Sequence, residues 1–158
     1  MVTKILDFCG NKVTISVDHG KLCRCHWIGE AEEESAVVLF DAPVEDLALM
    51  ADVEKQLKEY FEGDRKEFKL PLELKGTPFQ KKVWEELKKV PYGVTISYGE
   101  LSRRIGNPKA VRAVAQACGA NPVAIIVPCH RIIATGGKTG GYTGGVEHKI
   151  RLLEIETF

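Results

Sequence analysis

The sequence predicts a mixed α/β (α+β) fold with two domains, residues 1–70 and residues 71–158, and three observations lead to this prediction. Segments rich in β-branched residues, separated by glycine turns, fill the first 28 residues. Apolar residues at helical spacing, with recognisable helix caps, dominate from residue 47 onward. The 158 residues are 44% hydrophobic and 28% charged, a composition typical of a globular chain that buries a core.

The first domain is expected to begin as a small sheet. Strands are predicted at 2–8, 12–17 and 21–28, where β-branched and other apolar residues gather in short runs. The pairs Gly10-Asn11 and His19-Gly20 are turn signals between these runs. Their short spacing favours strands that follow one another directly.

A fourth apolar run lies at 36–40, and one helix follows it. Gly63 supplies the end of this helix, because glycine readily adopts the conformation in which helices stop. The apolar residues at helical spacing are Leu47, Met50, Val53, Leu57, Tyr60 and Phe61. Segment 70–76 contains Pro71 and is expected to be a linker or a short strand, so the domain boundary is placed there.

The second domain is predicted to be mostly helical, because capping signals recur at short intervals. Residues 77–80, Thr-Pro-Phe-Gln, combine an N-cap threonine, a first-turn proline and a capping-box glutamine. The Pro-Tyr-Gly sequence at 91–93 is expected to end that helix. Residues 97–100, Ser-Tyr-Gly-Glu, form a second capping box that opens a short helix to about Arg104.

Two helices, 98–104 and 108–118, are joined through Gly106 and outline a helix-turn-helix. Asn107-Pro108 is the expected cap of the second helix, which is rich in alanine and carries Arg112 near its middle. Small side chains let a helix approach DNA closely. Two helices that only pack a core are the alternative interpretation of the same spacing.

Charge is divided unequally between the two domains. The first 70 residues carry nine Lys and Arg against 15 Asp and Glu, whereas residues 71–158 carry 13 against seven. The basic half is therefore expected to meet an anion, of which nucleic acid is the commonest. A molecular dipole without a partner is the alternative.

The segment Pro128-Cys129-His130-Arg131 is the strongest candidate for chemistry. Neighbouring basic groups lower the pKa of a thiol and so favour the reactive thiolate. Because adjacent residues of an extended chain point to opposite faces, His130 needs a turn or a water relay to act on Cys129. A buried structural cysteine is the alternative. Pro128 and the glycine-rich loop at 135–145 favour a shaped, exposed turn, and a last helix is predicted from Val146 to about residue 154.

Other sequence features exclude several classes of protein. Cys9, Cys23, Cys25 and His26 match no common zinc spacing, and strand alternation would put Cys23 and Cys25 on one packed face. No nucleotide-binding loop or zinc-protease motif is present, so no metal and no cofactor are expected. The longest apolar stretch, at 123–127, is far shorter than a membrane span, and the first ten residues lack a secretory core.

The cysteine total is five, an odd number that fits reduced thiols and a cytoplasmic chain better than a secreted disulfide framework. Asn and Gln together number six, whereas Glu and Lys are abundant, which hints at a thermophilic source.

Residues 77–156 resemble the O6-alkylguanine-DNA alkyltransferase family. The first 70 residues match loosely, as the family's variable ribonuclease-H-like N-terminal domain would. The matching elements are Phe79-Gln80, Val83-Trp84, Tyr98, Asn107 to Val114, Asn121-Pro122, Pro128-Cys129-His130-Arg131 and Tyr142 to Gly145. The resemblance implies DNA repair by direct reversal: a cysteine thiolate takes the alkyl group from O6 of a guanine that is rotated out of double-stranded DNA, and each molecule acts once.

The resemblance also implies a catalytic role for five residues. Cys129 matches the acceptor thiol, His130 the base that deprotonates it through a water, and Glu156 the carboxylate that orients this base. Asn121 matches the residue that braces the active-site turn, and Tyr98 the phenol that helps guanine leave and crowds the phosphate. The order of nucleophile, base and orienting carboxylate follows general chemical logic, because displacement at an alkyl carbon needs a strong, soft nucleophile.

Contacts to DNA and to the flipped base are implied in the same way. Arg112 matches the finger that fills the space left in the duplex, and it lies with Ala110, Ala113 and Gln116 on the DNA-binding helix.

The substrate pocket is matched by Tyr142, Thr143 and Gly144, with Lys149 as a supporting base. Thr143 stands where many relatives have Ser, so its extra methyl group is expected to limit bulky adducts.

Two other functions compete with this one. An alkyltransferase-like module recognises damaged DNA without repairing it, but such relatives replace the acceptor cysteine, usually with Trp, and Cys129 argues against this. A cysteine hydrolase would use Cys129 and His130, yet it lacks an evident oxyanion hole and leaves the helix-turn-helix unexplained. The expected partner is double-stranded DNA that carries O6-alkylguanine, and the chain is expected to act as a monomer.

Overall fold

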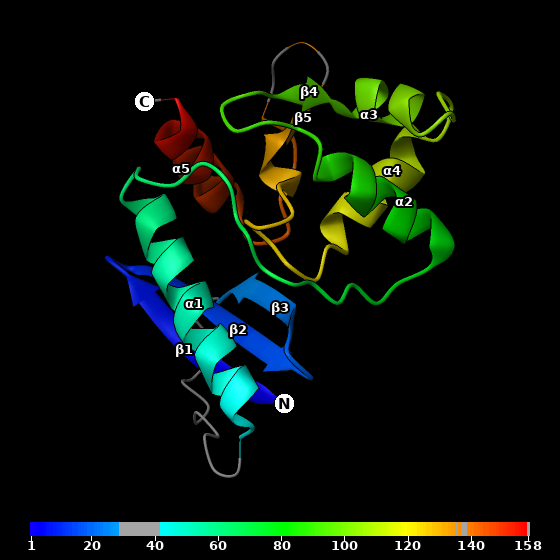
Figure 1. Cartoon of the computed structure of the whole chain (residues 1–158). Coiled ribbons are helices and arrows are strands. Elements are labelled where there is room, and N and C mark those ends of the chain that lie inside the picture. Colours follow the sequence, from blue (N-terminus) through cyan, green and yellow to red (C-terminus); the bar gives the residue numbers. More distant parts are fainter. Residues whose placement is uncertain (29–41, 135, 137–138, 158) are drawn as a thin grey trace. The chain divides into compact units, whose positions relative to one another are not determined.

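The computed structural model describes residues 1–28, 42–134, 136 and 139–157. These residues form two compact units, Met1–Leu74 and Lys75–Phe158, and each is described by itself (Figure 1). The apolar run at 36–40 lies outside the described residues. The mixed α/β class is confirmed, with a sheet and helix first and a mostly helical unit second.

The N-terminal unit is built on a three-stranded antiparallel sheet. Strands β1 (Val2–Phe8), β2 (Asn11–Asp18) and β3 (Lys21–Trp27) lie in sequence order. Both connections are two-residue hairpins whose residues all have positive φ: 55° and 91° for Cys9 and Gly10, and 49° and 72° for His19 and Gly20. Such turns match the twist of the flanking strands. The second turn lies at His19-Gly20 as predicted, whereas the first lies one residue earlier than the predicted Gly10-Asn11, because Asn11 already belongs to β2 and pairs with Phe8.

Helix α1 (Val44–Phe61) contacts all three strands and closes the core of this unit (Figure 1). The helix stops where predicted, because Gly63 adopts a φ of 81° just beyond its end. The fully buried side chains that fill the core between sheet and helix are Val13, Ile15, Val17, Leu22, Val53, Leu57 and Tyr60.

The expectation that Cys23 and Cys25 share one packed face is wrong. The register between β2 and β3 shifts after Ser16, which pairs with Arg24, because the next pair is Val17 with Leu22. Cys23 lies in this bulge, between the two pairs, and is partly exposed, whereas Cys25 is fully buried.

The C-terminal unit contains four α-helices, one 3₁₀ turn and two short strands within the described residues. In chain order these elements are α2 (Pro78–Leu87), β4 (Ile96–Ser97), α3 (Tyr98–Arg104), α4 (Val111–Gly119), η1 (Cys129–Arg131), β5 (Ile132–Ile133) and α5 (Val146–Glu156). Strands β4 and β5 pair in parallel and were not predicted, because two-residue strands carry no periodicity.

The predicted capping box of α2 is confirmed. The Thr77 hydroxyl accepts from the Gln80 amide at 3.1 Å, and the Gln80 side chain accepts from the Thr77 amide at 3.0 Å. The helix ends at Leu87 rather than at Pro91, because a turn with a hydrogen bond from the Val90 amide to the Leu87 carbonyl intervenes.

The helix-turn-helix is present, with corrections at both helix starts. The Ser97 hydroxyl caps α3, but the Glu100 carboxylate does not close the box; it pairs instead with Arg103 and Arg104. Gly106 has the left-handed φ, 80°, that was expected.

Helix α4 begins at Val111, three residues later than predicted. The Ala110 amide donates to the Asn107 carbonyl, so residues 107–110 form a turn and Ala110 precedes the helix as its N-cap rather than lying inside it. The last helix, α5, runs two residues beyond the predicted end.

Packing of α2 against α4 holds the helix-turn-helix in place. Trp84 is buried, and its indole N–H donates to the Ala117 carbonyl at 2.9 Å. Val114 and Ala117 form the buried face of α4. In the part of the chain that the structure describes, no helix has the length and apolar character needed to cross a membrane.

The Thr77 cap should contribute measurably to stability. We expect Thr77→Ala to lower the free energy of unfolding by about 1 kcal/mol, because the Gln80 amide loses its acceptor. Thr77→Ser, which keeps the hydroxyl, is the matched control and should lose much less. Urea unfolding followed by circular dichroism measures both, and equal losses would mean that the threonine methyl group, not the cap, is what matters.

Candidate active site

The segment before Cys129 is a strained turn braced by Asn121. The Asn121 amide group donates to the Val127 carbonyl at 2.8 Å, and its side-chain oxygen accepts from the Val123 amide at 3.0 Å. Between these contacts Ile125 has a φ of 72°, which is rare for a β-branched residue. Such a conformation persists only where its surroundings impose it, so the Asn121 bonds and the burial of Ile125 fix the turn.

Cys129 opens the 3₁₀ turn η1, in which the Arg131 amide donates to the Pro128 carbonyl. Of the two arrangements that the sequence left open, a turn or a water relay, the structure shows a turn at this site. The Cys129 side chain is nearly buried, with 7% of the residue exposed, rather than on an exposed turn as the sequence suggested.

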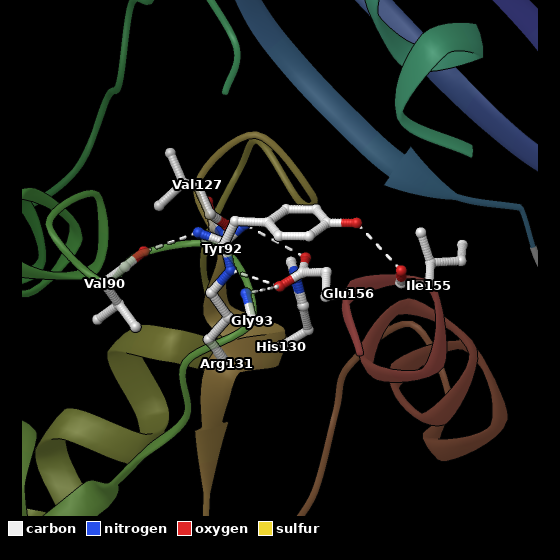
Figure 2. Close-up of polar contacts among 9 residues, drawn as sticks. Val90, Tyr92, Gly93, Val127, His130, Arg131, Ile155 and Glu156 are labelled. Atoms are coloured by element: carbon white, nitrogen blue, oxygen red, sulfur yellow. Dashed lines mark hydrogen bonds and ion pairs between the residues drawn. The ribbon is translucent and has the colours of Figure 1, made fainter. Parts of the chain in front are cut away.

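His130 and Glu156 form a buried pair. The imidazole Nε2 lies 2.5 Å from Glu156 Oε2, and His130 is fully buried (Figure 2). An ionised carboxylate can only accept, so we place the imidazole proton on Nε2. The other nitrogen, Nδ1, is buried and has no hydrogen-bond partner among the described residues. Nδ1 is therefore an available acceptor in the residue next to the thiol.

Glu156 also receives three further hydrogen bonds. Arg131 donates from Nε to Oε1 at 2.8 Å and from Nη2 to Oε2 at 3.2 Å, and the Gly93 amide donates to Oε1 at 3.3 Å. Figure 2 shows the carboxylate between these groups. Sequence reasoning treated residues 91–93 only as a helix end and gave Arg131 no partner, because the contacts join segments far apart in the chain.

Lys149 is a fully buried cation that contacts the loop before α5. Its ammonium donates to the Ile132 carbonyl at 2.5 Å and to the Gly141 carbonyl at 3.3 Å, and it lies 5.9 Å from the centre of the Tyr98 ring. The Tyr98 hydroxyl also reaches the Gly141 carbonyl, at 3.5 Å. A side chain at Gly140 would crowd both Tyr98 and the Ala134 backbone at 3.3 Å, so glycine keeps this approach open.

The electrostatics of the site favour a protonated thiol at rest. Burial raises the pKa of Cys129, whereas polar contacts with Asn121 and Tyr142 and the charge of Lys149 lower it. Burial lowers the pKa of His130, which keeps the imidazole neutral. Burial, joined by the charges of Cys118 and Cys129, raises the pKa of Tyr98 to about 12, so its hydroxyl remains a donor.

The remaining residues that sequence analysis selected lie on α4 and on the loop before α5. Arg112, Ala113 and Gln116 are exposed residues of α4, and Ala110 is partly exposed at its start. The Thr143 hydroxyl donates to the Gly119 carbonyl at 2.8 Å, which links the pocket loop to the end of α4. Gly144 is half-buried in the same loop.

Cys118 is a second buried thiol near Cys129. It is buried near the end of α4, and burial with the charge of Cys129 raises its pKa to about 12. In the described ranges, no group of three or more His, Cys, Asp or Glu residues could hold a metal ion.

Comparison with known proteins places the chain in one family. Residues 78–158 match the model of the 6-O-methylguanine DNA methyltransferase DNA-binding domain, and residues 6–74 match the model of the ribonuclease-like domain of the same protein. A methylated-DNA–protein-cysteine methyltransferase from Methanosarcina acetivorans is 49% identical over 116 residues, which cover 73% of this chain and 74% of that protein.

Relatives and structures from other organisms agree. A Mycobacterium tuberculosis protein of the same name is 54% identical over 101 residues, covering 64% of this chain and 61% of that protein. The crystal structure of Mycobacterium tuberculosis OGT in complex with DNA has a TM-score of 0.85 and 38% identity, covering 98% of this chain and 92% of the other. The chain therefore belongs to the 6-O-methylguanine DNA methyltransferase family, as its sequence predicted.

Proposed function

We propose that this protein repairs DNA by direct reversal, moving an alkyl group from O6 of a flipped guanine to the Cys129 thiol in an irreversible, single-turnover reaction. The family and its relatives support the coarser statement, DNA repair by alkyl transfer. The observation that carries the finer proposal is the buried thiol next in sequence to a buried imidazole, whose Nε2 is held by Glu156 and whose Nδ1 can accept a proton.

The reaction balances with this chain's own groups. The Cys129 S–H bond breaks and its proton passes through one water to His130 Nδ1. The thiolate sulfur attacks the alkyl carbon, the S–C bond forms, the C–O6 bond breaks, and its electron pair stays on guanine. The Tyr98 hydroxyl donates its proton to the departing guanine, and the proton held on His130 returns to the Tyr98 oxygen through water. The net exchange is one proton for one alkyl group.

Two features explain why the thiol needs a base and why it reacts only once. The pKa of Cys129 is raised by burial, so the resting group is a thiol and needs the His130 base at the moment of transfer. The product is a thioether, which has no leaving group that water can displace under mild conditions. The acceptor is therefore consumed, and each chain acts once.

The outer face of α4 is the proposed DNA-contact surface. Arg112, Ala113 and Gln116 lie on it, opposite the buried Val114 and Ala117. Small side chains allow close approach to a groove, and Arg112 is long enough to enter the space left by a flipped base. Damaged duplex DNA is thus the proposed partner.

We also propose that the chain acts as a monomer in the cytoplasm. The contact helix and the acceptor thiol belong to the same unit of one chain, and the odd cysteine total fits a reducing compartment.

Transfer to Cys129 is tested by mass. Incubation with duplex DNA that carries O6-methylguanine should add about one methyl group per chain, on Cys129. Cys129→Ser should abolish transfer, because a hydroxyl is a much poorer nucleophile. Cys118→Ser, which alters the neighbouring thiol, is the matched control and should retain transfer. Methylation of the Cys129→Ser protein at Cys118 would reassign the acceptor; DNA binding without transfer by the unmodified protein would support a recognition module, and repeated turnover a hydrolase.

The role of Arg112 is tested with two substrates. Arg112→Ala should slow repair of duplex DNA much more than reaction with the base O6-benzylguanine, because the base alone needs no flipping. Arg151→Ala removes the same charge from α5 and serves as the control, with a small effect on both substrates. Equal losses on the two substrates in Arg112→Ala would show that this arginine supports the fold instead.

Alkylation should destabilise the spent protein. Cys129 and Cys118 are both buried, and they are near enough for the charge of Cys129 to raise the pKa of Cys118, so we expect a new apolar group on Cys129 to press on the end of α4. Overpacking of this kind costs about 1–3 kcal/mol. We expect the methylated form to melt below the unmodified form, the benzylated form lower still, and both to bind DNA more weakly. Superimposable melting curves for the three forms would contradict this.

A further inference from the structure

Arg131 is a buried cation to which the proposed reaction of Cys129, His130 and Glu156 assigns no role. Only 7% of Arg131 is exposed, and its guanidinium donates two hydrogen bonds to the Glu156 carboxylate. Its third contact, Nη1 to the Val90 carbonyl at 2.7 Å, fixes the group from the opposite side. The ring of Tyr92 lies 5.8 Å from the guanidinium carbon, within the range of a cation–π contact. Figure 2 shows this arrangement.

We propose that Arg131 is a positioning residue for alkyl transfer: by holding Glu156 as an anion against His130 Nε2, it fixes the imidazole tautomer in which Nδ1 is the base. This inference rests on the proposed function, because it assigns a role within that reaction. In the described part of the chain the Arg131 side chain donates to Glu156 and to the Val90 carbonyl rather than to the thiol, and its charge also lowers the pKa of His130.

The tautomer depends on the charge of Glu156. An ionised carboxylate accepts from Nε2–H, which leaves Nδ1 bare and able to take the thiol proton. A protonated carboxyl group would instead donate to Nε2, and the imidazole would then carry its proton on Nδ1, where it cannot act as a base. Glu156 is 5% exposed and ends α5, where the helix dipole is negative, so burial and the dipole both oppose its charge. Arg131 supplies the compensating positive charge.

The turn after α2 holds Arg131 and Glu156 in position relative to each other. The Gly93 amide donates to Glu156 Oε1, and a Cβ at Gly93, whose φ is 78°, would lie 3.1 Å from the Glu156 carbonyl oxygen. The Tyr92 hydroxyl donates to the Ile155 carbonyl at 3.0 Å. The Val90 carbonyl comes from the same segment, so one stretch of chain holds both Arg131 and the end of α5.

Charged and titratable groups reach His130 from each element packed on it. Glu156 and Lys149 come from α5, and Arg131 comes from η1 beside Cys129. Burial lowers the pKa of His130 most, Glu156 raises it, and Arg131 and Lys149 lower it. Tyr92 approaches from the turn after α2; burial and then Glu156 raise its pKa, whereas Arg131 lowers it, so it stays neutral. Loss of Arg131 therefore acts on His130 in one direction, toward proton uptake at higher pH.

The test is a titration of His130 by nitrogen NMR on the full chain labelled with ¹⁵N-histidine. The unmodified protein should show the Nε2–H tautomer and a neutral imidazole at neutral pH. Arg131→Gln should raise the midpoint pH at which the His130–Glu156 pair takes up a proton by about one to three pH units. Arg131→Lys keeps a charge without the planar fork and should hold the midpoint near that of the unmodified protein. Once the midpoint lies above the assay pH, transfer from O6-benzylguanine should fall about tenfold for each further pH unit by which the midpoint rises.

Tyr92→Phe is the structural control, since it removes the bond to Ile155 and no charge, and its His130 midpoint should not move. A folded Arg131→Gln protein with the original tautomer and midpoint would overturn the proposal. If that variant does not fold, the unmodified protein still decides: a Glu156 side-chain ¹³C signal that titrates between about pH 5 and 8 with Arg131 in place overturns it, and a constant ionised signal supports it. Because this readout needs no substrate, failure of alkyl transfer itself would be seen separately.

Discussion

A nearly buried carboxylate, Glu156, lies at the end of α5, and the proposed catalytic chain depends on how its charge is balanced. Burying an ion costs several kcal/mol unless hydrogen bonds and an opposite charge offset the loss of water. Glu156 receives them from His130 and Arg131 of the 3₁₀ turn and from Gly93 after α2. The same contacts that neutralise the charge therefore tie three distant segments together and set the direction in which the imidazole points.

Short sequence motifs predicted the parts of the fold that depend on the conformational preferences of one or two neighbouring residues. The Gly10 and Gly20 hairpins, the Thr77 cap and the Gly63 helix end each follow from one or two residues whose conformational preferences are strong. Prediction failed where a second local interaction competed. The Glu100 carboxylate forms ion pairs with the arginines one turn ahead instead of closing the capping box. The turn that begins at Asn107 makes α4 start later than predicted. The Cys23 bulge comes from strand pairing, which the strand's own residues do not encode.

The candidate site shows the same division. The thiol and its imidazole are adjacent in sequence, so they could be selected as a candidate nucleophile and base from residue types alone. The partners that shape them were not: Arg131 and Gly93 reach Glu156 across 25 and 63 residues. Only the family resemblance linked Glu156 and Lys149 to the thiol, because nothing in their own surroundings in the sequence separates them from surface residues of an ordinary amphipathic helix.

The near burial of Cys129 has a consequence for the protein between encounters with damage. A nucleophile that can react only once is lost to any electrophile or oxidant that reaches it first, and both attack the thiolate far more readily than the thiol. Here 7% exposure limits access, and the raised pKa keeps the sulfur protonated. Under the proposed function, low intrinsic reactivity in the resting state would preserve the Cys129 thiol from small reactive molecules until damaged DNA binds.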